Sequence, residues 1–132
     1  MKILGIGNAI VDVLCKVNDE FIITNELKKS NMKLIFEKNE FSKLLSNLKI
    51  EKTISGGSVA NSIVGLAQLG NNVGFIGKIS DDDLGNEYEI GLKKENVKYI
   101  YNKKKETLPT GTCLILVTPD SERTMCTFLG TA

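Results

Sequence analysis

Histidine and tryptophan are absent from the 132 residues, and proline and cysteine are scarce. Without histidine, the chain has no Ser-His or Cys-His nucleophile pair, no HExxH metal site and no imidazole acid–base chemistry. The three cysteines, Cys15, Cys113 and Cys126, are widely spaced in apolar stretches and form no CxxC pair. We therefore expect buried, reduced thiols rather than a disulfide or a zinc site. Any chemistry must use carboxylates, lysine, backbone amides or a bound ion.

The sequence also lacks an excess of one charge and a long apolar run. Its formal net charge is +1 at pH 7, so bulk electrostatics favours neither nucleic acid nor an anionic membrane as a partner. The longest apolar runs, such as residues 113–117, are far shorter than a membrane span. Residues 1–6 are too short for a signal peptide and predict a strand. We expect a cytoplasmic protein that binds neither nucleic acid nor membranes.

Hydrophobic periodicity predicts strands that alternate with helices, followed by a strand-rich segment. Strands are expected at 2–6, 11–17, 33–36, 73–79, 99–101, 111–118 and 123–128, and helices at 19–27, 40–48, 58–69 and 82–95. Ser58 is expected to cap the third helix and Gly70 to end it. Residues 119–122 predict a hairpin turn. The order indicates an α/β fold with a mostly parallel sheet flanked by helices. Because the chain stops directly after an apolar strand, we expect a domain that is incomplete.

Two glycine-rich stretches invite functional interpretations. Residues 5–10 half-match the dinucleotide fingerprint GxGxxG, but Ile10 takes the third glycine position and a strand, not a helix, is expected next. Residues 56–61, "GGSVAN", have neither the lysine of a phosphate-binding loop nor a histidine to activate Ser58. This second stretch offers bare backbone amides at a strand-to-helix junction, where they can bind a ligand oxygen. Alternatively, it is a plain tight turn.

Several polar residues have a structural and a functional interpretation. Asp12 is a lone carboxylate among apolar residues, and it predicts either an outward-facing strand position or a pocket carboxylate that accepts bonds from ligand hydroxyls. Asn8 is either a turn residue or a further ligand contact. The three acids at 81–83 cannot all face one ion, so one helix cap with solvated neighbours is favoured over a metal site. The lysine run at 103–105 is read as a solvated turn.

Four stretches together resemble the ribokinase-like (PfkB) family of carbohydrate and nucleoside kinases, and adenosine kinase-type members above all. They are "GIGNAIVDVL", "SGGSVANSIVGLAQLG", "VGFIGKISDDDLG" and "PTGTCLILVTPDSERTM", in the family's order and at similar separations. Ser80 departs from the pattern, because the family commonly has glycine there. The resemblance implies a ribokinase-like α/β fold with a small β-lid, of which residues 1–132 are the N-terminal part of a single domain.

The resemblance assigns substrate-binding roles to matching positions. Asp12 and Asn61 match residues that bond sugar hydroxyls, and Gly56 and Gly57 match paired glycines that lie against the sugar. Asn8 matches a residue near the base or the anomeric side in nucleoside kinases. The implied ligand is therefore a small-molecule sugar or nucleoside, and adenosine-like nucleosides are favoured.

The resemblance also implies a lid and a floor for the same site. Strands near 11–17, 33–36 and 99–101 would form the lid, which can also pair two subunits into a homodimer. The strand at 123–128 would line the floor, with Met125 and Thr127 as substrate contacts.

The family's catalytic half is missing from residues 1–132. Its base is an aspartate in a DTxGAGD-type motif whose amides stabilise charge during phosphoryl transfer, and no such motif occurs here. The resemblance therefore implies that the base lies beyond Ala132, and that residues 1–132 have no catalytic residue.

Cofactor use follows from the same resemblance. The whole enzyme would use ATP and Mg²⁺ to phosphorylate a primary hydroxyl, whereas this part is expected to bind no cofactor or metal and to be inactive alone. The alternatives are a non-catalytic sugar- or nucleoside-binding or interaction module and, third, a dinucleotide-binding oxidoreductase.

Overall fold

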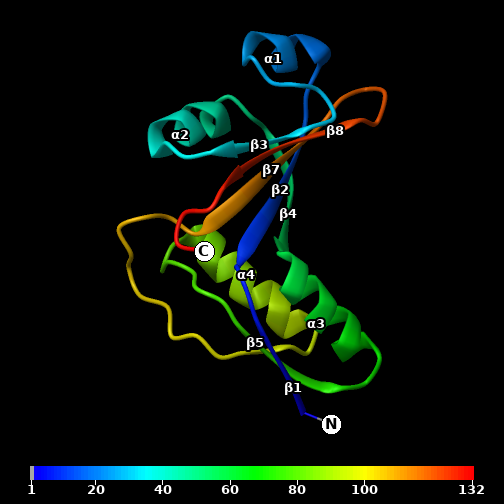
Figure 1. The fold of residues 1–132 in the computed structure, drawn as a ribbon, viewed down its shortest axis with the longest axis vertical. Coiled ribbons are helices and arrows are strands. Elements are labelled where there is room, and N and C mark those ends of the chain that lie inside the picture. The colour runs from blue at the N-terminus through cyan, green and yellow to red at the C-terminus, as the bar shows by residue number, and fades with distance from the viewer. Residues whose placement is uncertain (1) are drawn as a thin grey trace. The chain divides into compact units, whose positions relative to one another are not determined.

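The computed structural model describes residues 2–132, which form two compact units built from interleaved segments (Figure 1). The first unit comprises residues 2–11, 54–111 and 130–132. The second comprises residues 12–53 and 112–129. The chain therefore alternates between the units along its length, and strands at the crossings contribute residues to both.

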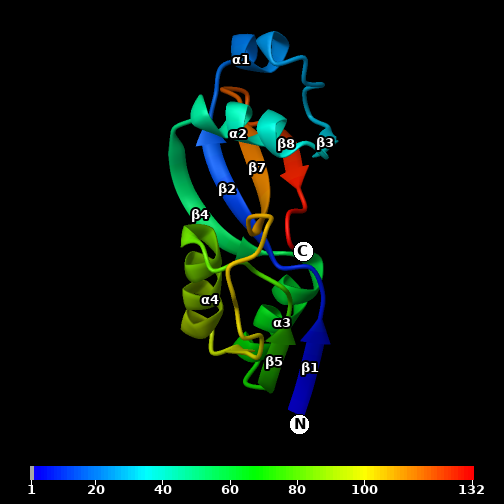
Figure 2. The same ribbon diagram turned by 90° about the vertical axis from the view of Figure 1, so that its left-hand side faces the viewer.

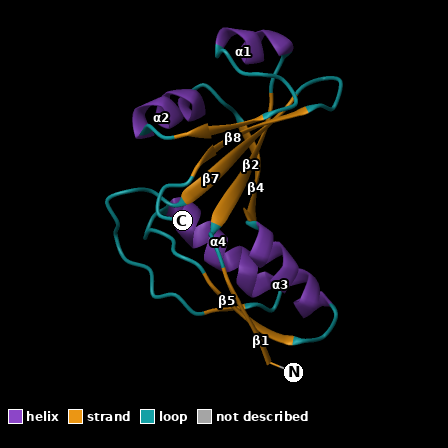
Figure 3. Ribbon diagram, viewed as in Figure 1, coloured by secondary structure: helices purple, strands orange, loops and turns teal. Residues whose placement is uncertain are grey.

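The first unit has a three-stranded parallel sheet in the order β1-β5-β6, of which β1 and β5 are labelled in Figure 3. Its elements are β1 (Lys2–Ile6), α3 (Ser58–Gln68), β5 (Asn72–Ile76), α4 (Asp83–Lys94) and β6 (Lys98–Tyr99). Helix α3 packs on β1 and β5, and α4 packs on β6. Glycine at position 5 permits the close approach of α3, because a Cβ there would lie 2.5 Å from Ile63 Cγ1.

Aromatic side chains form the core of this first unit. Phe75 on β5 and Tyr88 on α4 have no exposed surface, and their ring centroids are 6.2 Å apart. Tyr99 on β6 joins them, 6.5 Å from Phe75 and 6.1 Å from Tyr88. Its hydroxyl donates a hydrogen bond to the Gly77 carbonyl oxygen at 2.5 Å. Burial of these rings joins α4 to the sheet.

The second unit has a five-stranded sheet in the order β3-β8-β7-β2-β4 (Figure 2). Its elements are β2 (Ile10–Lys16), α1 (Asp19–Thr24), β3 (Met32–Ile35), α2 (Lys38–Ser46), β4 (Ile50–Gly56), β7 (Gly111–Val117) and β8 (Arg123–Phe128). Strand β3 is parallel to β8, with Met32 opposite Met125. Strands β7 and β8 form an antiparallel hairpin.

The two faces of this five-stranded sheet differ in burial. On one face Val13, Leu114 and Cys126 are fully buried, and Phe128 stacks on Phe41 of α2 with ring centroids 5.1 Å apart. Strand residues alternate between faces, so the intervening positions lie on the opposite face. There Met125 is 37% exposed, and the other side chains are mostly half-buried.

The structure confirms the predicted α/β class, the hairpin at 119–122 and three buried, free cysteines. It also corrects several details. Strand β4 is absent from the sequence prediction. The helix predicted at 19–27 ends at Thr24, because Glu26 has a positive φ of 52° and the Asn25 side chain donates to the Phe21 carbonyl.

Two further predictions differ from the structure. The strand expected at 99–101 is β6, which pairs with β5 in the three-stranded sheet and not with the strands near 11–17 and 33–36. Ser58 does not cap α3: Gly57 is the N-cap residue, and no side chain forms a cap hydrogen bond. Gly70 follows the end of α3 with a positive φ of 82°, as a stop residue should.

Candidate functional site

The predicted site residues fall into two groups, one in each unit. Asn8, Gly56, Gly57 and Asn61 lie in the first unit. Asp12, Met125 and Thr127 lie in the second.

Asn8 and Gly57 are in direct contact in the first unit. Gly57 has φ +97° and ψ 137°, a conformation that residues with a Cβ avoid. A Cβ at Gly57 would also collide with the Asn8 carbonyl oxygen. The chain's own backbone at Asn8 therefore requires glycine here. This steric requirement does not test the predicted contact between the glycine pair and a sugar, which stays a prediction.

The N-terminus of α3 adds backbone donors beside this contact. No side chain caps the helix, so its first-turn N–H groups lack that acceptor. Asn61, on this first turn, is exposed, and its backbone N–H donates to the Gly57 carbonyl oxygen at 2.9 Å. Asn8 is exposed too. Gly57 thus connects the backbone of Asn8 with that of Asn61 at a helix start whose amides lack a side-chain cap, and such amides can bind ligand oxygens.

Gly56 is held by Tyr88, a residue to which the sequence assigns no role in the site. The Tyr88 hydroxyl donates to the Gly56 carbonyl oxygen at 3.2 Å, and the Ser55 hydroxyl donates to the Tyr88 carbonyl oxygen at 2.9 Å. Periodicity marks Tyr88 as a core position of a helix. Nothing in the sequence pairs it with Gly56, which lies 32 positions earlier.

Asp12 projects from β2 in the second unit and is half-buried. Burial raises the pKa of its carboxyl, and no hydrogen-bond donor or cation among residues 2–132 offsets this effect. A ligand with hydroxyl groups could donate hydrogen bonds to this carboxylate and so stabilise its ionised form.

Cys113 and Thr127 lie on the same face of the five-stranded sheet as Asp12. They are opposite one another in the β7–β8 register, and the Thr127 hydroxyl donates to Cys113 Sγ at 3.3 Å. Burial raises the pKa of the Cys113 thiol, and the negative charge of Asp12 adds to this rise, whereas the Thr127 bond opposes it. Met125 shares the face, because it is two positions from Thr127 on β8. Cys113 was not predicted as part of this face, although the alternation of side chains along the strand could have placed it there from the sequence.

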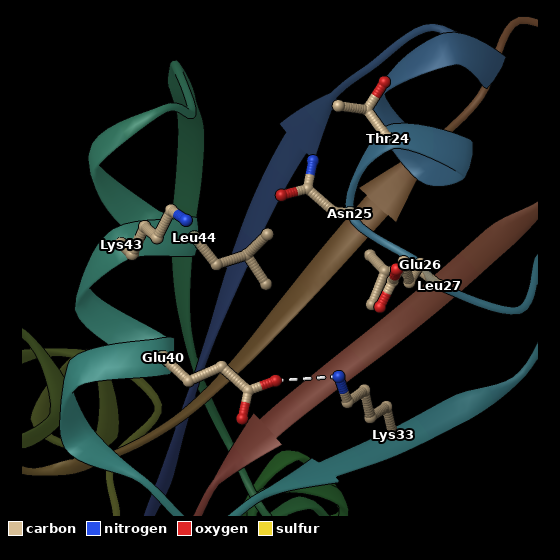
Figure 4. A pocket seen from close by; sticks show the side chains of 8 residues that line it. All are labelled: Thr24, Asn25, Glu26, Leu27, Lys33, Glu40, Lys43 and Leu44. Atoms are coloured by element: carbon tan, nitrogen blue, oxygen red, sulfur yellow. Dashed lines mark hydrogen bonds and ion pairs between the residues drawn. The ribbon is translucent and has the colours of Figure 1, made fainter.

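Two hollows in the second unit contain none of the predicted site residues. One, of about 290 Å³, lies between the end of α1 and α2, where Lys33 Nζ and Glu40 Oε1 form an ion pair at 2.7 Å (Figure 4). The other, of about 510 Å³, is lined by Leu14, Val117 and Arg123 among others. The predicted residues instead lie on a sheet face and at a helix N-terminus.

Of the three acids at 81–83, Asp82 is the helix cap. Its carboxylate accepts hydrogen bonds from the Gly85 N–H at 2.8 Å and from the Thr110 hydroxyl at 2.7 Å. Among residues 2–132, no three His, Cys, Asp or Glu side chains gather in a way that would hold a metal ion. Within the same residues, no helix has the length and apolarity needed to cross a membrane.

The family's catalytic aspartate has no counterpart among the described residues. The position of the base therefore stays a prediction.

Comparison with known proteins identifies the family. The model of the pfkB family of carbohydrate kinases matches residues 16–132, and the chain belongs to this family. Adenosine kinase 2 of Arabidopsis thaliana is 29% identical over 120 residues, which are 87% of this chain and 34% of that protein.

Solved structures confirm the ribokinase-like fold. A probable sugar kinase from Rhizobium etli is 35% identical with a TM-score of 0.84, and the match covers 98% of this chain and 39% of that one. An adenosine kinase from Sinorhizobium meliloti is also 35% identical, with a TM-score of 0.83 and coverage of 99% and 40%. The chain thus spans between 34% and 40% of the length of these relatives.

Proposed function

We propose that this chain is the acceptor-recognition part of an ATP-dependent kinase that transfers a γ-phosphoryl group to the primary hydroxyl of a nucleoside or sugar. Asp12 is the observation that supports it most strongly. A half-buried carboxylate with a raised pKa and no donor among residues 2–132 is poorly stabilised by its own protein. Two vicinal hydroxyls of a pentose would supply the missing hydrogen bonds.

In this proposal the chain's own residues bind and orient the acceptor. Asp12 accepts bonds from the sugar hydroxyls, Asn61 bonds a further hydroxyl, and the Gly56–Gly57 pair lies against the ring. Asn8 contacts the base or the anomeric side, while Met125 and Thr127 line the floor. Fixing the hydroxyls in this way holds the primary hydroxyl in one orientation for attack, which lowers the entropic part of the barrier.

ATP and Mg²⁺ belong to the whole enzyme in this proposal. The nucleotide supplies the phosphoryl group, and the metal neutralises charge on it. Residues 2–132 contain no cluster of metal-binding side chains, so we assign no step of that chemistry to them. Such an enzyme would work in the cytoplasm, where ATP is available, and its five-stranded sheet is a candidate surface for a homodimer.

Adenosine-like nucleosides are the favoured acceptors. The stretch "GNAIVDVL" is typical of nucleoside kinases, and one of the two relatives that are 35% identical is an adenosine kinase. The other is a probable sugar kinase, so free sugars belong in any test. A module that binds the same ligands without catalysis is the second candidate, because no DTxGAGD-type motif occurs in residues 1–132.

The test uses the whole protein that contains this chain, assayed with ATP and Mg²⁺ against adenosine, other nucleosides and free sugars. We expect turnover of one acceptor class. Asp12→Ala should raise the acceptor KM by roughly two to four decades, because two charge-assisted bonds of about 1.5–3 kcal/mol each are lost. Binding without turnover would favour the second candidate. Turnover that survives Asp12→Ala with an unchanged KM would remove Asp12 from the site.

A further inference from the structure

Tyr88 connects helix α4 to the glycine pair at the end of β4. Its hydroxyl donates to the Gly56 carbonyl oxygen, and Ser55 returns a bond to the Tyr88 carbonyl. The Tyr88 side chain has no exposed surface, and its ring packs against the rings of both Phe75 and Tyr99. The ring is therefore fixed by packing, and its hydroxyl is held at one position against Gly56.

This bond determines more than the position of one carbonyl. The Gly56 carbonyl and the Gly57 N–H belong to one planar trans peptide group, in which they point in opposite directions. Neither flanking residue has a Cβ, so the plane would otherwise rotate easily. By holding the carbonyl, the Tyr88 hydroxyl directs the Gly57 N–H away from α4, at the uncapped start of α3.

We propose that Tyr88 is a positioning residue for acceptor binding: acting through Gly56, it orients the Gly57 N–H toward the sugar before the sugar arrives. The inference rests on the proposed function, in which the glycine pair lies against the acceptor. Because the Gly56–Gly57 peptide is already ordered in the free protein, acceptor binding does not carry the entropic cost of ordering it. The Tyr88 hydroxyl therefore raises the affinity for the acceptor. Tyr88 itself touches neither the acceptor nor the transferred phosphoryl group.

The test compares Tyr88→Phe with Ser55→Ala in the whole protein. Each variant breaks one of the bonds described above between α4 and the end of β4, and each keeps the aromatic core. Only Tyr88→Phe frees the Gly56–Gly57 peptide. We expect Tyr88→Phe to raise the acceptor KM at least about fivefold with kcat within about twofold, and Ser55→Ala to leave KM within about twofold. Both variants should melt below the parent by similar amounts.

Equal KM values for Tyr88→Phe and the parent, or equal increases in the two variants, would overturn the inference. If Tyr88→Phe does not fold, amide hydrogen exchange of the parent protein, with and without acceptor, tests the inference instead. The saturating acceptor should slow exchange in the peptide that contains Gly57, and unchanged exchange there overturns the inference. Failure of the proposed function is distinct, because the parent would then turn over and bind none of the tested acceptors.

Discussion

The Asp12 carboxylate disfavours folding at neutral pH, and in the proposed function it favours ligand binding. Burial raises its pKa in the folded protein above the unfolded value, so the native state binds the proton more readily. Stability from this group is therefore present below its unfolded pKa and is lost as pH rises through the raised folded pKa. At neutral pH the ionised carboxylate destabilises the free protein.

We therefore expect Asp12→Asn to raise the melting temperature of the free protein at pH 7, although the proposed function predicts weaker acceptor binding for this variant. The gain should shrink as pH falls through the raised folded pKa, and it should vanish well below about 4, where the parent carboxyl is protonated in both states. Thermal melts across this pH range measure the effect. The exposed Asp81→Asn variant is the control and should show no such gain. An Asp12→Asn protein that melts lower than the parent at pH 7 would contradict the argument.

Gly57 has a positive φ and also lies close to the Asn8 carbonyl oxygen. Comparison with Gly70 separates the cost of backbone strain from the cost of a steric collision. Gly70 has φ +82° but nothing within 4 Å of the position that an alanine methyl would take, whereas a methyl at Gly57 meets the Asn8 carbonyl oxygen. Gly70→Ala should lower the free energy of unfolding by about 1 kcal/mol through backbone strain alone. Gly57→Ala should lower it further, with or without ligand, as denaturant titrations can measure. Equal losses of unfolding free energy in the two variants would show that the contact with Asn8 relaxes without a cost in stability.

At the scale of elements, Asp82 joins the start of α4 to the chain before β7. It accepts bonds from the Gly85 N–H, from the Thr110 N–H at 2.9 Å and from the Thr110 hydroxyl. Asp82→Ala removes the helix cap and a partner of the buried Thr110. We expect a loss of about 2–4 kcal/mol in the free energy of unfolding, measured by denaturant titration. Asp81→Ala, at the exposed neighbour, should change it by less than about 0.5 kcal/mol.

The elements best predicted from the sequence are those whose local pattern agrees with their burial. Strand β8 alternates between buried and accessible residues, and both of its predicted bounds match the structure. Strand β4 escapes prediction because Glu51 and Lys52 interrupt its apolar pattern, which an edge strand tolerates. The predicted cap of α3 is wrong because Gly57, with a positive φ, occupies the N-cap position, and Ser58 is the first helical residue.

The candidate site was predictable only where a family motif names the residue. Asp12 and Asn61 follow from such motifs. The bond between Tyr88 and Gly56 does not, because it depends on tertiary packing of a helix against a strand end 32 residues earlier. The contact between Asn8 and Gly57 likewise appears only once β1 and α3 pack together.

At the scale of the whole molecule, recognition and catalysis are expected to reside in different parts of the protein. Residues 1–132 hold the predicted acceptor contacts but no DTxGAGD-type motif. We therefore expect the 132-residue chain by itself to show no ATP-dependent turnover of any nucleoside or sugar in a coupled assay. The whole protein, at the same molar concentration, is the positive control. Turnover by the isolated chain well above the blank would contradict this division.

The parallel pairing of β3 with β8 has a consequence during protein synthesis. Ser30, just before β3, donates its N–H to the Thr124 hydroxyl on β8, 94 residues later. At about 5–20 residues per second, a ribosome needs roughly 5–20 s to deliver that partner. For this interval the nascent chain displays β3 without its neighbouring strand, an open edge on which chains emerging from adjacent ribosomes can pair. Slow translation between these two segments should therefore increase aggregation, and the nascent chain should depend on a chaperone until β8 has left the ribosome.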